Sequence, residues 1–321
     1  MKRSSILVTG GYGFIGSNLV AYLHNKYSSF KIVVLDKMDS DAANEINIPK
    51  DIRDDNDRFL LIKGDICNQE FINNAFLENN VKYVFHLAAQ THVDNSYKDP
   101  LECIMENIQG TYMIMNACRQ HNVEKVLHMS TDEVYGDTGN NEAPATEKGT
   151  VLDPTNPYSA SKAACEHIVK MMYHSWKLPM VIARSNNVYG PRQCLQKVVP
   201  LFIDKIKSSD NPSLELHDGG DQKRTWVFVE DVCEALDFIF KKGTLGEIYN
   251  IATEDELSVK EIALLIASLM NKQDSLHLTH IRKRPHNDQR YFINGDKLLK
   301  LGWIAKTKIK QGMQKTINWY L

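Results

Sequence analysis

The chain has 321 residues, a formal charge of −2 and 43% hydrophobic residues. These values indicate a folded protein, either a core domain with a smaller one or a single large α/β unit, and they exclude wholesale disorder. The near-neutral charge gives no bulk electrostatic reason to expect nucleic acid or an anionic membrane as a partner.

No apolar run approaches the length needed to span a membrane, and Gly10-Gly11 interrupts the first apolar residues too early for a signal peptide. The cysteines lack CxxC spacing, which indicates free thiols in a reducing compartment. We therefore expect a cytoplasmic protein without a metal site. The cysteines are Cys67, Cys103, Cys118, Cys165, Cys194 and Cys233.

The first motif is a run of glycines between a predicted strand at 4–9 and a predicted amphipathic helix at 17–27. Its spacing, GxxGxxG, is a variant of the dinucleotide-binding fingerprint: the glycines permit a tight turn, close approach of a pyrophosphate and close helix–strand packing. The N–H groups at the helix start suit phosphate oxygens. We expect this loop to bind the cofactor through Gly10, Gly13, Phe14, Ile15 and Gly16.

Asp36 follows the second predicted strand, 31–35, at the distance expected for a ribose-binding acid. A carboxylate there accepts hydrogen bonds from both ribose hydroxyls and repels a 2′-phosphate, which favours NAD over NADP. The alternative is a helix-capping or loop acid. The polar segment 38–57 then predicts a loop near the cofactor or the substrate.

A third strand, predicted at 59–62, leads into Asp65 and Ile66. Asp65 could accept from the adenine amino group while Ile66 packs on the ring. A role for Asp65 at the start of a helix over 68–77 is about equally compatible with its chemistry.

A fourth strand, predicted at 83–87, runs into Ala88 and Ala89, which are small enough to let the backbone approach a bound cofactor. Thr91 could reach a sugar or make a local turn contact. A long helix is predicted at 100–121.

The fifth strand, predicted at 126–129, is followed by Ser130-Thr131-Asp132-Glu133. In open α/β sheets ligands bind beyond the carboxyl ends of the strands. Adjacent acids repel each other, and partial burial raises the pKa of at least one, so that one protonated and one ionised acid can serve paired proton transfer. The alternative is a pair of turn-capping acids.

Tyr158 and Lys162 are four residues apart in a predicted helix and therefore share a face. A lysine ammonium and an oxidised nicotinamide would both lower the pKa of the phenol, which could then accept a hydroxyl proton as hydride leaves the same carbon. A YxxxK pair alone is usually a surface pair. Together with the glycine motif, Asp36 and Thr131, it indicates a catalytic site.

The glycine motif, Ser130-Thr131 and the Tyr158–Lys162 pair together resemble the extended short-chain dehydrogenase/reductase family, over nearly the whole chain. Within it, the run from Thr131 to Gly136 is similar to the nucleotide-sugar 4,6-dehydratases. The block 284–291 is most similar to the dehydratase part of plant rhamnose synthases, which use UDP-glucose. Bacterial dTDP-glucose enzymes usually carry Gly-His where this chain has His286-Asn287, so the resemblance favours UDP-glucose over dTDP-glucose.

The resemblance implies a reaction in three steps. Tyr158 takes the C4 hydroxyl proton, Thr131 hydrogen-bonds the same oxygen, and hydride passes to NAD. The 4-keto group acidifies the C5 proton, which Glu133 removes while protonated Asp132 protonates the departing C6 hydroxyl. Hydride returns to C6 and a proton to C5, which gives NDP-4-keto-6-deoxy-D-glucose.

The resemblance also implies contacts with the substrate. Arg224 and Arg290 match arginines that pair with the diphosphate, and a guanidinium can meet phosphate oxygens in two bonds. Asn187 could donate to a phosphate, or it could form an Asx-turn before Gly190-Pro191. The predicted substrate residues are Thr91, Asn187, Lys197, Arg224, Asn287 and Arg290.

These patterns predict an α/β fold, a Rossmann-type doubly wound parallel sheet with a smaller mixed α/β substrate domain. We assign 1–184 and 225–251 to the NAD-binding part, with a strand at 227–232 returning to the sheet, and 185–224 and 252–321 to the nucleotide-sugar part. Family resemblance suggests a homodimer through the helices at 100–121 and 158–176. The alternatives are a UDP-sugar 4-epimerase and a non-catalytic dinucleotide-binding protein.

Overall fold

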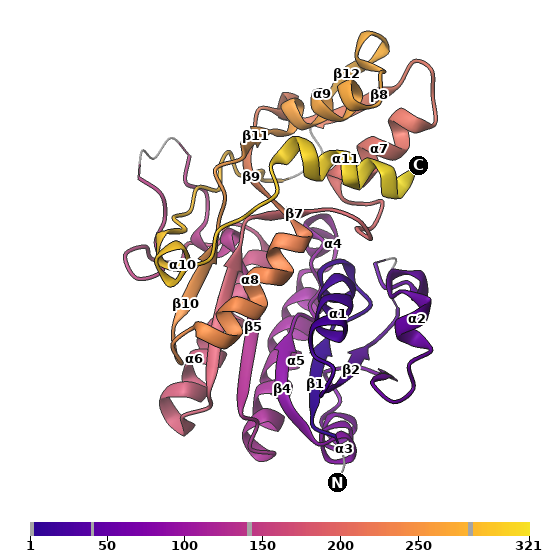
Figure 1. Ribbon diagram of the computed structural model, residues 1–321. Coiled ribbons are helices and arrows are strands. Elements are labelled where there is room, and N and C mark those ends of the chain that lie inside the picture. The colour runs from indigo at the N-terminus through magenta and orange to yellow at the C-terminus, as the bar shows by residue number, and fades with distance from the viewer. Residues whose placement is uncertain (1–2, 40–41, 140–142, 282–284) are drawn as a thin grey trace.

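A seven-stranded parallel sheet forms the centre of the larger part of the molecule (Figure 1). The computed structural model describes residues 3–39, 42–139, 143–281 and 285–321. Arg284, which opens the block that resembles the plant enzymes, lies outside them. The strands are β1 (Ser5–Thr9), β2 (Lys31–Asp36), β3 (Phe59–Lys63), β4 (Val81–His86), β5 (Lys125–Thr131), β6 (Met180–Ser185) and β10 (Ile248–Ile251).

The strand order is β10-β6-β5-β4-β1-β2-β3. The chain runs outward from β1 to β3 on one side and from β4 to β10 on the other, so the order reverses between β1 and β4. Ligand sites in doubly wound sheets lie in the crevice at this switch point, beyond the carboxyl ends of the strands. The predicted fold class is confirmed.

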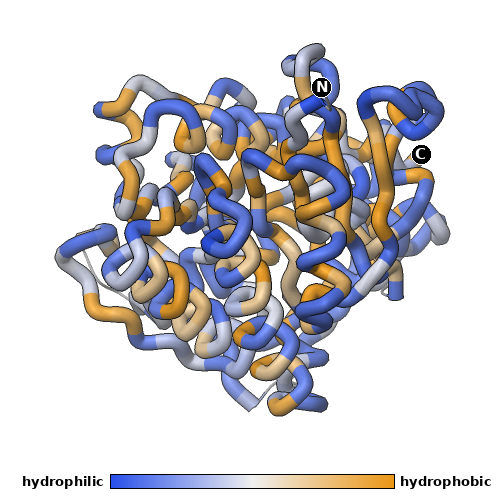
Figure 2. Tube along the Cα trace, turned by 90° about the horizontal axis from the view of Figure 1, so that it is seen from below, coloured by the Kyte–Doolittle hydropathy of each residue, from blue (hydrophilic) through white to orange (hydrophobic). Residues whose placement is uncertain are grey.

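Helices cover both faces of the sheet, which explains why its strands are largely apolar. One face packs on α1 (Phe14–Lys26) and α8 (Val229–Lys242), and the other on α3 (Gln69–Asn79), α5 (Pro100–Gln120) and α6 (Pro157–Trp176). Figure 2 shows the central strands as hydrophobic stretches between hydrophilic outer turns.

A smaller unit covers the carboxyl-end side of the sheet (Figure 1). It has its own apolar core, centred on residues such as Phe202, Trp226 and Ile266. Its strands are β7 (Asn187–Tyr189), β8 (Ser213–His217), β9 (Lys223–Phe228), β11 (Glu256–Ser258) and β12 (His277–Ile281). Its longer helices are α7 (Val198–Lys207), α9 (Val259–Leu269) and α11 (Ile309–Tyr320).

The short elements lie in the connections. They are η1 (Glu45–Asn47), α2 (Lys50–Arg53), α4 (Val93–Lys98), η2 (Asp132–Tyr135), η3 (Asp218–Gly220), η4 (Gln273–Ser275) and α10 (Asp296–Leu301). No helix within the four described ranges is both long and apolar enough to cross a membrane.

The prediction of a strand at 227–232 returning to the main sheet is wrong. Strand β9 ends at Phe228 and pairs with β7 and β11 of the smaller unit, and α8 begins at Val229. Val229, Val232 and Leu236 recur at helical spacing and are all buried, so this β-branched run was apolar enough for a strand but periodic enough for a helix. The rest of the domain division stays a prediction.

Segment 38–57 is also more ordered than the predicted loop. It contains η1 and α2, and Ile48 and Ile52 are buried in the same core as α1. Residues 40–41 of this segment lie outside the described ranges.

A fully buried ion pair fixes α6 to β6. Both carboxylate oxygens of Glu166 accept hydrogen bonds from Arg184, at 2.8 and 2.6 Å. The Arg184 guanidinium also lies 4.5 Å from the ring centre of Tyr135 in η2. Since α6 carries Tyr158 and η2 carries the acid pair Asp132-Glu133, this one guanidinium connects these two segments.

We expect Glu166→Gln to lower the free energy of unfolding by about 3–5 kcal/mol, because it leaves the Arg184 charge buried without its partner. Urea unfolding measures this. The matched control is Glu230→Gln, which removes an exposed pair with Lys315 at 2.9 Å and should cost at most about 1 kcal/mol. Equal losses in the two variants would contradict the importance of burial.

Candidate active site

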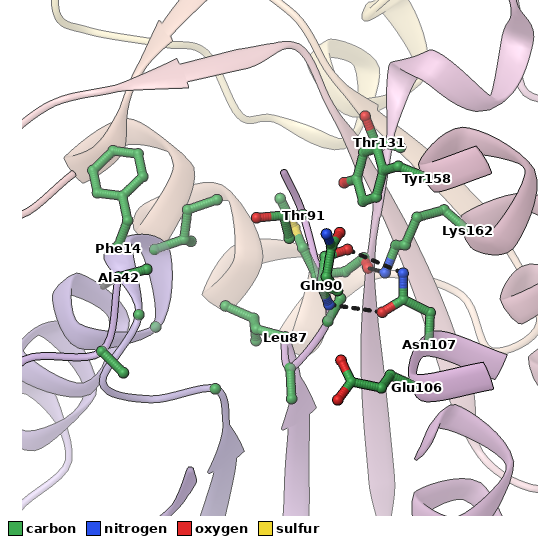
Figure 3. Close-up of a pocket in the computed structure, with 18 of the residues that line it drawn as sticks. Phe14, Ala42, Leu87, Gln90, Thr91, Glu106, Asn107, Thr131, Tyr158 and Lys162 are labelled. Atoms are coloured by element: carbon green, nitrogen blue, oxygen red, sulfur yellow. Dashed lines mark hydrogen bonds between the residues drawn. The ribbon is translucent and has the colours of Figure 1, made fainter. Parts of the chain in front are cut away.

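A cavity of about 400 Å³ lies at the carboxyl ends of the central strands (Figure 3). Phe14 and Ala42 lie on one side of it in Figure 3, and Thr131, Tyr158 and Lys162 on the other. The structure brings most of the predicted site residues together in its wall: Gly10, Gly13, Phe14, Ile15, Gly16, Asp36, Asp65, Ile66, Ala88, Ala89, Thr91, Thr131, Asp132, Glu133, Tyr158, Lys162, Asn187 and Lys197.

The glycine loop leaves no room for side chains. Gly10 has φ +68°, a left-handed conformation that favours glycine, and a Cβ there would lie 2.8 Å from the Ala88 Cα. A Cβ at Gly16 would lie 2.0 Å from the Gly10 carbonyl oxygen. Helix α1 therefore starts tight against β1, with its first N–H groups at the cavity, an arrangement that fits a dinucleotide pyrophosphate.

The Asp36 carboxylate is held in place by two backbone amides. Its Oδ2 accepts from the Tyr12 N–H and its Oδ1 from the Met38 N–H, each at 2.9 Å. Burial raises its pKa, while the two amide bonds oppose the rise. Each oxygen keeps a lone pair for a ribose hydroxyl, so the geometry fits the predicted role.

Asp65, the second acid predicted to contact the cofactor, does not cap helix α3. Asn68 is the N-cap of α3, and its side chain accepts from the Phe71 N–H at 3.1 Å. Asp65 Oδ1 accepts instead from the Cys67 N–H at 2.8 Å, and Asp65 lines the cavity.

The two acids after β5 have separate amide donors. Asp132 Oδ2 accepts from Asn186 Nδ2 at 2.8 Å, and Asp132 Oδ1 accepts from the Thr131 hydroxyl at 3.3 Å. Glu133 Oε2 accepts from Asn156 Nδ2 at 3.1 Å. Asp132 is buried and Glu133 half-buried, and both line the cavity, so they are not exposed turn-capping acids.

Burial dominates the protonation of this pair. It raises the pKa of Asp132 to about 7; the Asn186 hydrogen bond opposes the rise and the Glu133 charge adds to it. Burial also raises the pKa of Glu133, against the hydrogen bond from Asn156. Near neutral pH the site can therefore hold one protonated and one ionised acid.

The phenol of Tyr158 differs from the sequence-based expectation. Burial, with the charge of Glu133, raises its pKa well above the ordinary value, and a hydrogen bond with Thr131 lowers it only in part. Lowering by Lys162 is not among the main causes of this shift, and the Lys162 ammonium donates to the Met129 carbonyl at 2.6 Å. Burial lowers the pKa of Lys162.

Three predicted substrate residues do not line the cavity: Arg224, Asn287 and Arg290. Arg224 is nevertheless close to the acid pair, because its charge lowers the pKa values of both acids. Its guanidinium donates to the Lys223 and Asp288 carbonyls, each at 2.8 Å, and lies 4.3 Å from the Tyr291 ring centre.

Arg290 and Asn287 bind other protein groups. The Arg290 guanidinium donates twice to the Glu256 carboxylate, at 2.6 and 3.0 Å. Asn287 donates to Asp218 Oδ2 at 3.2 Å. Either residue would have to exchange these bonds to reach a substrate.

Side-chain amides hold the site. Asn107 accepts from the Gln90 N–H at 2.7 Å and donates to the Gln90 carbonyl at 3.0 Å (Figure 3). Asn156 and Asn186, the donors to the acids, were not identified. The capping position of Asn156 before Pro157 was a usable signal, since N-cap asparagines keep a free N–H₂ group; for Asn186 only its adjacency to Asn187 pointed to the site.

Comparison with known sequences and structures gives the relatives of this chain. The family model for GDP-mannose 4,6 dehydratase matches residues 7–316. Human dTDP-D-glucose 4,6-dehydratase is 39% identical over 320 residues, which are 98% of this chain and 89% of the human protein. A trifunctional UDP-glucose 4,6-dehydratase/3,5-epimerase/reductase of Arabidopsis thaliana is 39% identical over 99% of this chain, which spans only 47% of that relative.

Two solved structures show the same fold. The dTDP-glucose 4,6-dehydratase of Bacillus anthracis, in complex with NAD, has a TM-score of 0.89 and 33% identity, and the match covers 99% of this chain and 96% of that one. The UDP-glucose 4-epimerase of Thermus thermophilus, in complex with NAD, has a TM-score of 0.88 and 30% identity, over 98% of both chains. With the family match over residues 7–316, the chain belongs to the GDP-mannose 4,6 dehydratase family of nucleotide-sugar enzymes.

Proposed function

We propose that this protein is an NAD-dependent NDP-glucose 4,6-dehydratase that forms NDP-4-keto-6-deoxy-D-glucose. The observation that carries the proposal is the pair Asp132 and Glu133, held by separate amides in the same cavity as Tyr158. A redox step alone needs no such pair, whereas loss of water across C5–C6 needs a base and an acid together.

The cofactor is held by the glycine loop, Asp36, Asp65, Ile66, Ala88 and Ala89, with Tyr158 and Lys162 at its nicotinamide end. When bound, NAD supplies a reversible hydride acceptor. The tight glycine loop and the two free lone pairs of Asp36 support this assignment.

Tyr158 takes the proton of the C4 hydroxyl while Thr131 hydrogen-bonds the same oxygen. Glu133 removes the C5 proton, which the new 4-keto group has made acidic, and returns it at the end. Asp132 protonates the C6 hydroxyl, which leaves as water. Thr91, Asn187, Lys197 and Arg224 hold the sugar and its diphosphate.

The runner-up is a UDP-sugar 4-epimerase, which the likeness to the Thermus thermophilus enzyme favours. It would use Tyr158 and NAD without an acid pair. Incubation with UDP-glucose separates the two, since the epimerase gives UDP-galactose and the dehydratase a 4-keto-6-deoxy sugar. Bound NAD without turnover of any NDP-hexose would favour the non-catalytic alternative.

We expect Glu133→Gln to lower steady-state product formation by about 10²–10⁴-fold, because the C5 proton loses its base. Oxidation at C4 should persist, since Tyr158 and Thr131 are unchanged. Product assay and the absorbance of the reduced cofactor in a single turnover measure the two steps.

The control for this variant is Glu254→Gln, an exposed glutamate outside the cavity wall, which should leave both steps unchanged. Normal product formation by Glu133→Gln would remove Glu133 from the mechanism.

The pH dependence should show the acid role of Asp132. A general acid must be protonated, and burial raises the pKa of Asp132 to about 7, so kcat/KM should fall about tenfold per pH unit above about pH 7. The profile is measured from about pH 5 to 9 in the wild type and in Asp132→Asn, whose low residual activity should lack this decline. A decline of the same position and slope in Asp132→Asn would assign it to another group.

We also propose which nucleotide the substrate carries. UDP-glucose is favoured by the block around His286-Asn287 and by the match to the Arabidopsis thaliana relative over 99% of this chain. The human dTDP-glucose enzyme has the same overall identity to this chain. The choice of UDP-glucose over dTDP-glucose therefore rests on the block around His286-Asn287.

We expect UDP-glucose to be consumed first when equal concentrations of UDP-glucose and dTDP-glucose compete, as measured by mass spectrometry of the products. The double exchange His286→Gly with Asn287→His should shift the preference toward dTDP-glucose, whereas Glu254→Gln should not. Preferential use of dTDP-glucose by the wild type would overturn the choice.

The homodimer and the cytoplasmic location stay predictions. The proposed dimer helices α5 and α6 pack side by side and present exposed apolar side chains, as a dimer interface requires: Leu101, Met105, Tyr112, Met171 and Trp176.

A further inference from the structure

Thr9 and His86 form a buried hydrogen bond beside the glycine loop. Thr9 Oγ1 and His86 Nδ1 lie 2.7 Å apart, and the two residues are 0% and 1% exposed. Thr9 Oγ1 also accepts from the N–H groups of Leu87 and Ala88, each at 3.2 Å. A hydroxyl has two acceptor lone pairs and one proton. The Thr9 proton therefore goes to His86, and Nδ1 is the ring nitrogen that carries no proton.

The other side of the His86 ring leads to helix α6. His86 Nε2 lies 3.1 Å from Thr111 Oγ1. The Thr111 hydroxyl donates to Cys165 Sγ at 3.3 Å, and the Cys165 thiol donates to the Asn107 carbonyl at 3.1 Å. A carbonyl can only accept, so the thiol proton points to Asn107 and the Thr111 proton to Cys165. Thr111 must then accept from His86, and Nε2 carries the ring proton.

The two ends of this hydrogen-bonded chain assign the same tautomer of His86 independently. Burial and the charge of Lys162 lower the pKa of His86 to about 3, so the ring is neutral near neutral pH. A neutral imidazole has one N–H group and one bare nitrogen. An N–H group on Nδ1 would meet the Thr9 oxygen, whose lone pairs are taken by two backbone amides. The direction of the chain is therefore fixed.

The chain holds the segment 87–90, which belongs to the cavity wall. The hydroxyl at one end of the chain fixes the first two N–H groups of this segment. Asn107, at the other end, accepts from the Gln90 N–H at 2.7 Å and donates to the Gln90 carbonyl at 3.0 Å (Figure 3). The glycine loop touches the same segment, since a Cβ at Gly10 would lie 2.8 Å from the Ala88 Cα. A shift of the segment would therefore change the cavity beside the glycine loop.

We propose that His86 is a positioning residue for NAD: as the neutral Nε2–H tautomer, it holds segment 87–90 in place against the glycine loop. The Nδ1 side of the ring does this through Thr9. The Nε2 side ties the same segment to α6, the helix that carries Tyr158 and Lys162. The inference concerns cofactor binding, so it goes beyond the proposed function and does not depend on which reaction follows.

Two variants separate the roles of the two ring nitrogens. In His86→Asn the amide oxygen can still accept from Thr9. In His86→Gln the amide N–H can still donate to Thr111, but the Thr9 hydroxyl loses its acceptor. We expect NAD to leave His86→Gln about tenfold faster than the wild type, and to leave His86→Asn at a rate within about twofold of it. The exchange of bound NAD for isotope-labelled NAD in the full chain measures these rates.

The matched control is Thr316→Val, which removes a buried hydroxyl that donates to the Gly312 carbonyl at 2.8 Å within α11. It should lower the free energy of unfolding and leave NAD exchange unchanged. If NAD exchange is accelerated equally in His86→Gln and His86→Asn, or equally in His86→Gln and Thr316→Val, the role of His86 is merely structural and the proposal is overturned.

The tautomer can also be observed in the wild type, so the test does not depend on the folding of the variants. Nitrogen NMR of histidine-labelled protein near neutral pH should show a proton on His86 Nε2 and none on Nδ1. A proton on Nδ1, alone or together with one on Nε2, would overturn the proposal. A wild-type protein that exchanges NAD as expected but turns over no NDP-glucose would overturn only the proposed function.

Discussion

The pairing of β5 with β6 is the constraint on which the proposed site depends. The two parallel strands are in register from Val126 with Met180 to Thr131 with Ser185. The residues that follow each strand, Asp132 and Asn186, are therefore brought together, and their side chains form a buried hydrogen bond. A shift of one residue in this register would turn the acid away from the amide and place it on the wrong side of the sheet.

Helix α6 brings the other proposed catalytic residues to the same edge of the sheet. Its N-cap, Asn156, reaches back to Glu133, and its first turns carry Tyr158 and Lys162. Further along, Glu166 binds Arg184 on β6, and Arg184 packs on Tyr135 beside the acids. The proposed base and acids thus lie on separate segments that share one buried network, which fixes their relative positions more firmly than surface loops would.

Burial of the two acids makes the proposed acid chemistry possible, but it also costs free energy. Taking carboxyl groups out of water destabilises their ionised forms, which makes one of them available as an acid at neutral pH. The hydrogen bonds from Asn186 and Asn156 offset part of that cost and keep the acids oriented. The result is a pair of acids whose environment, more than their identity, sets their roles.

Local sequence motifs were enough to predict the fold class and most of the residues in the cavity wall. The glycine loop, Asp36, the strand ends and the YxxxK pair are each read from a few neighbouring residues, and the family resemblance pointed to the acid pair. These signals report backbone geometry and residue chemistry that do not depend on distant partners, so they predicted the fold class and most of the cavity wall.

Tertiary structure alone decided what bonds to each of these residues. Nothing in the sequence indicated that Asn186 would hold Asp132, that Lys162 would donate to Met129, or that Arg290 would bind Glu256. It also decided that β9 joins the smaller sheet, because an apolar β-branched run suits either sheet. The physical reason is common to all: pKa values and free hydrogen-bonding groups are set by neighbours that only folding brings into contact.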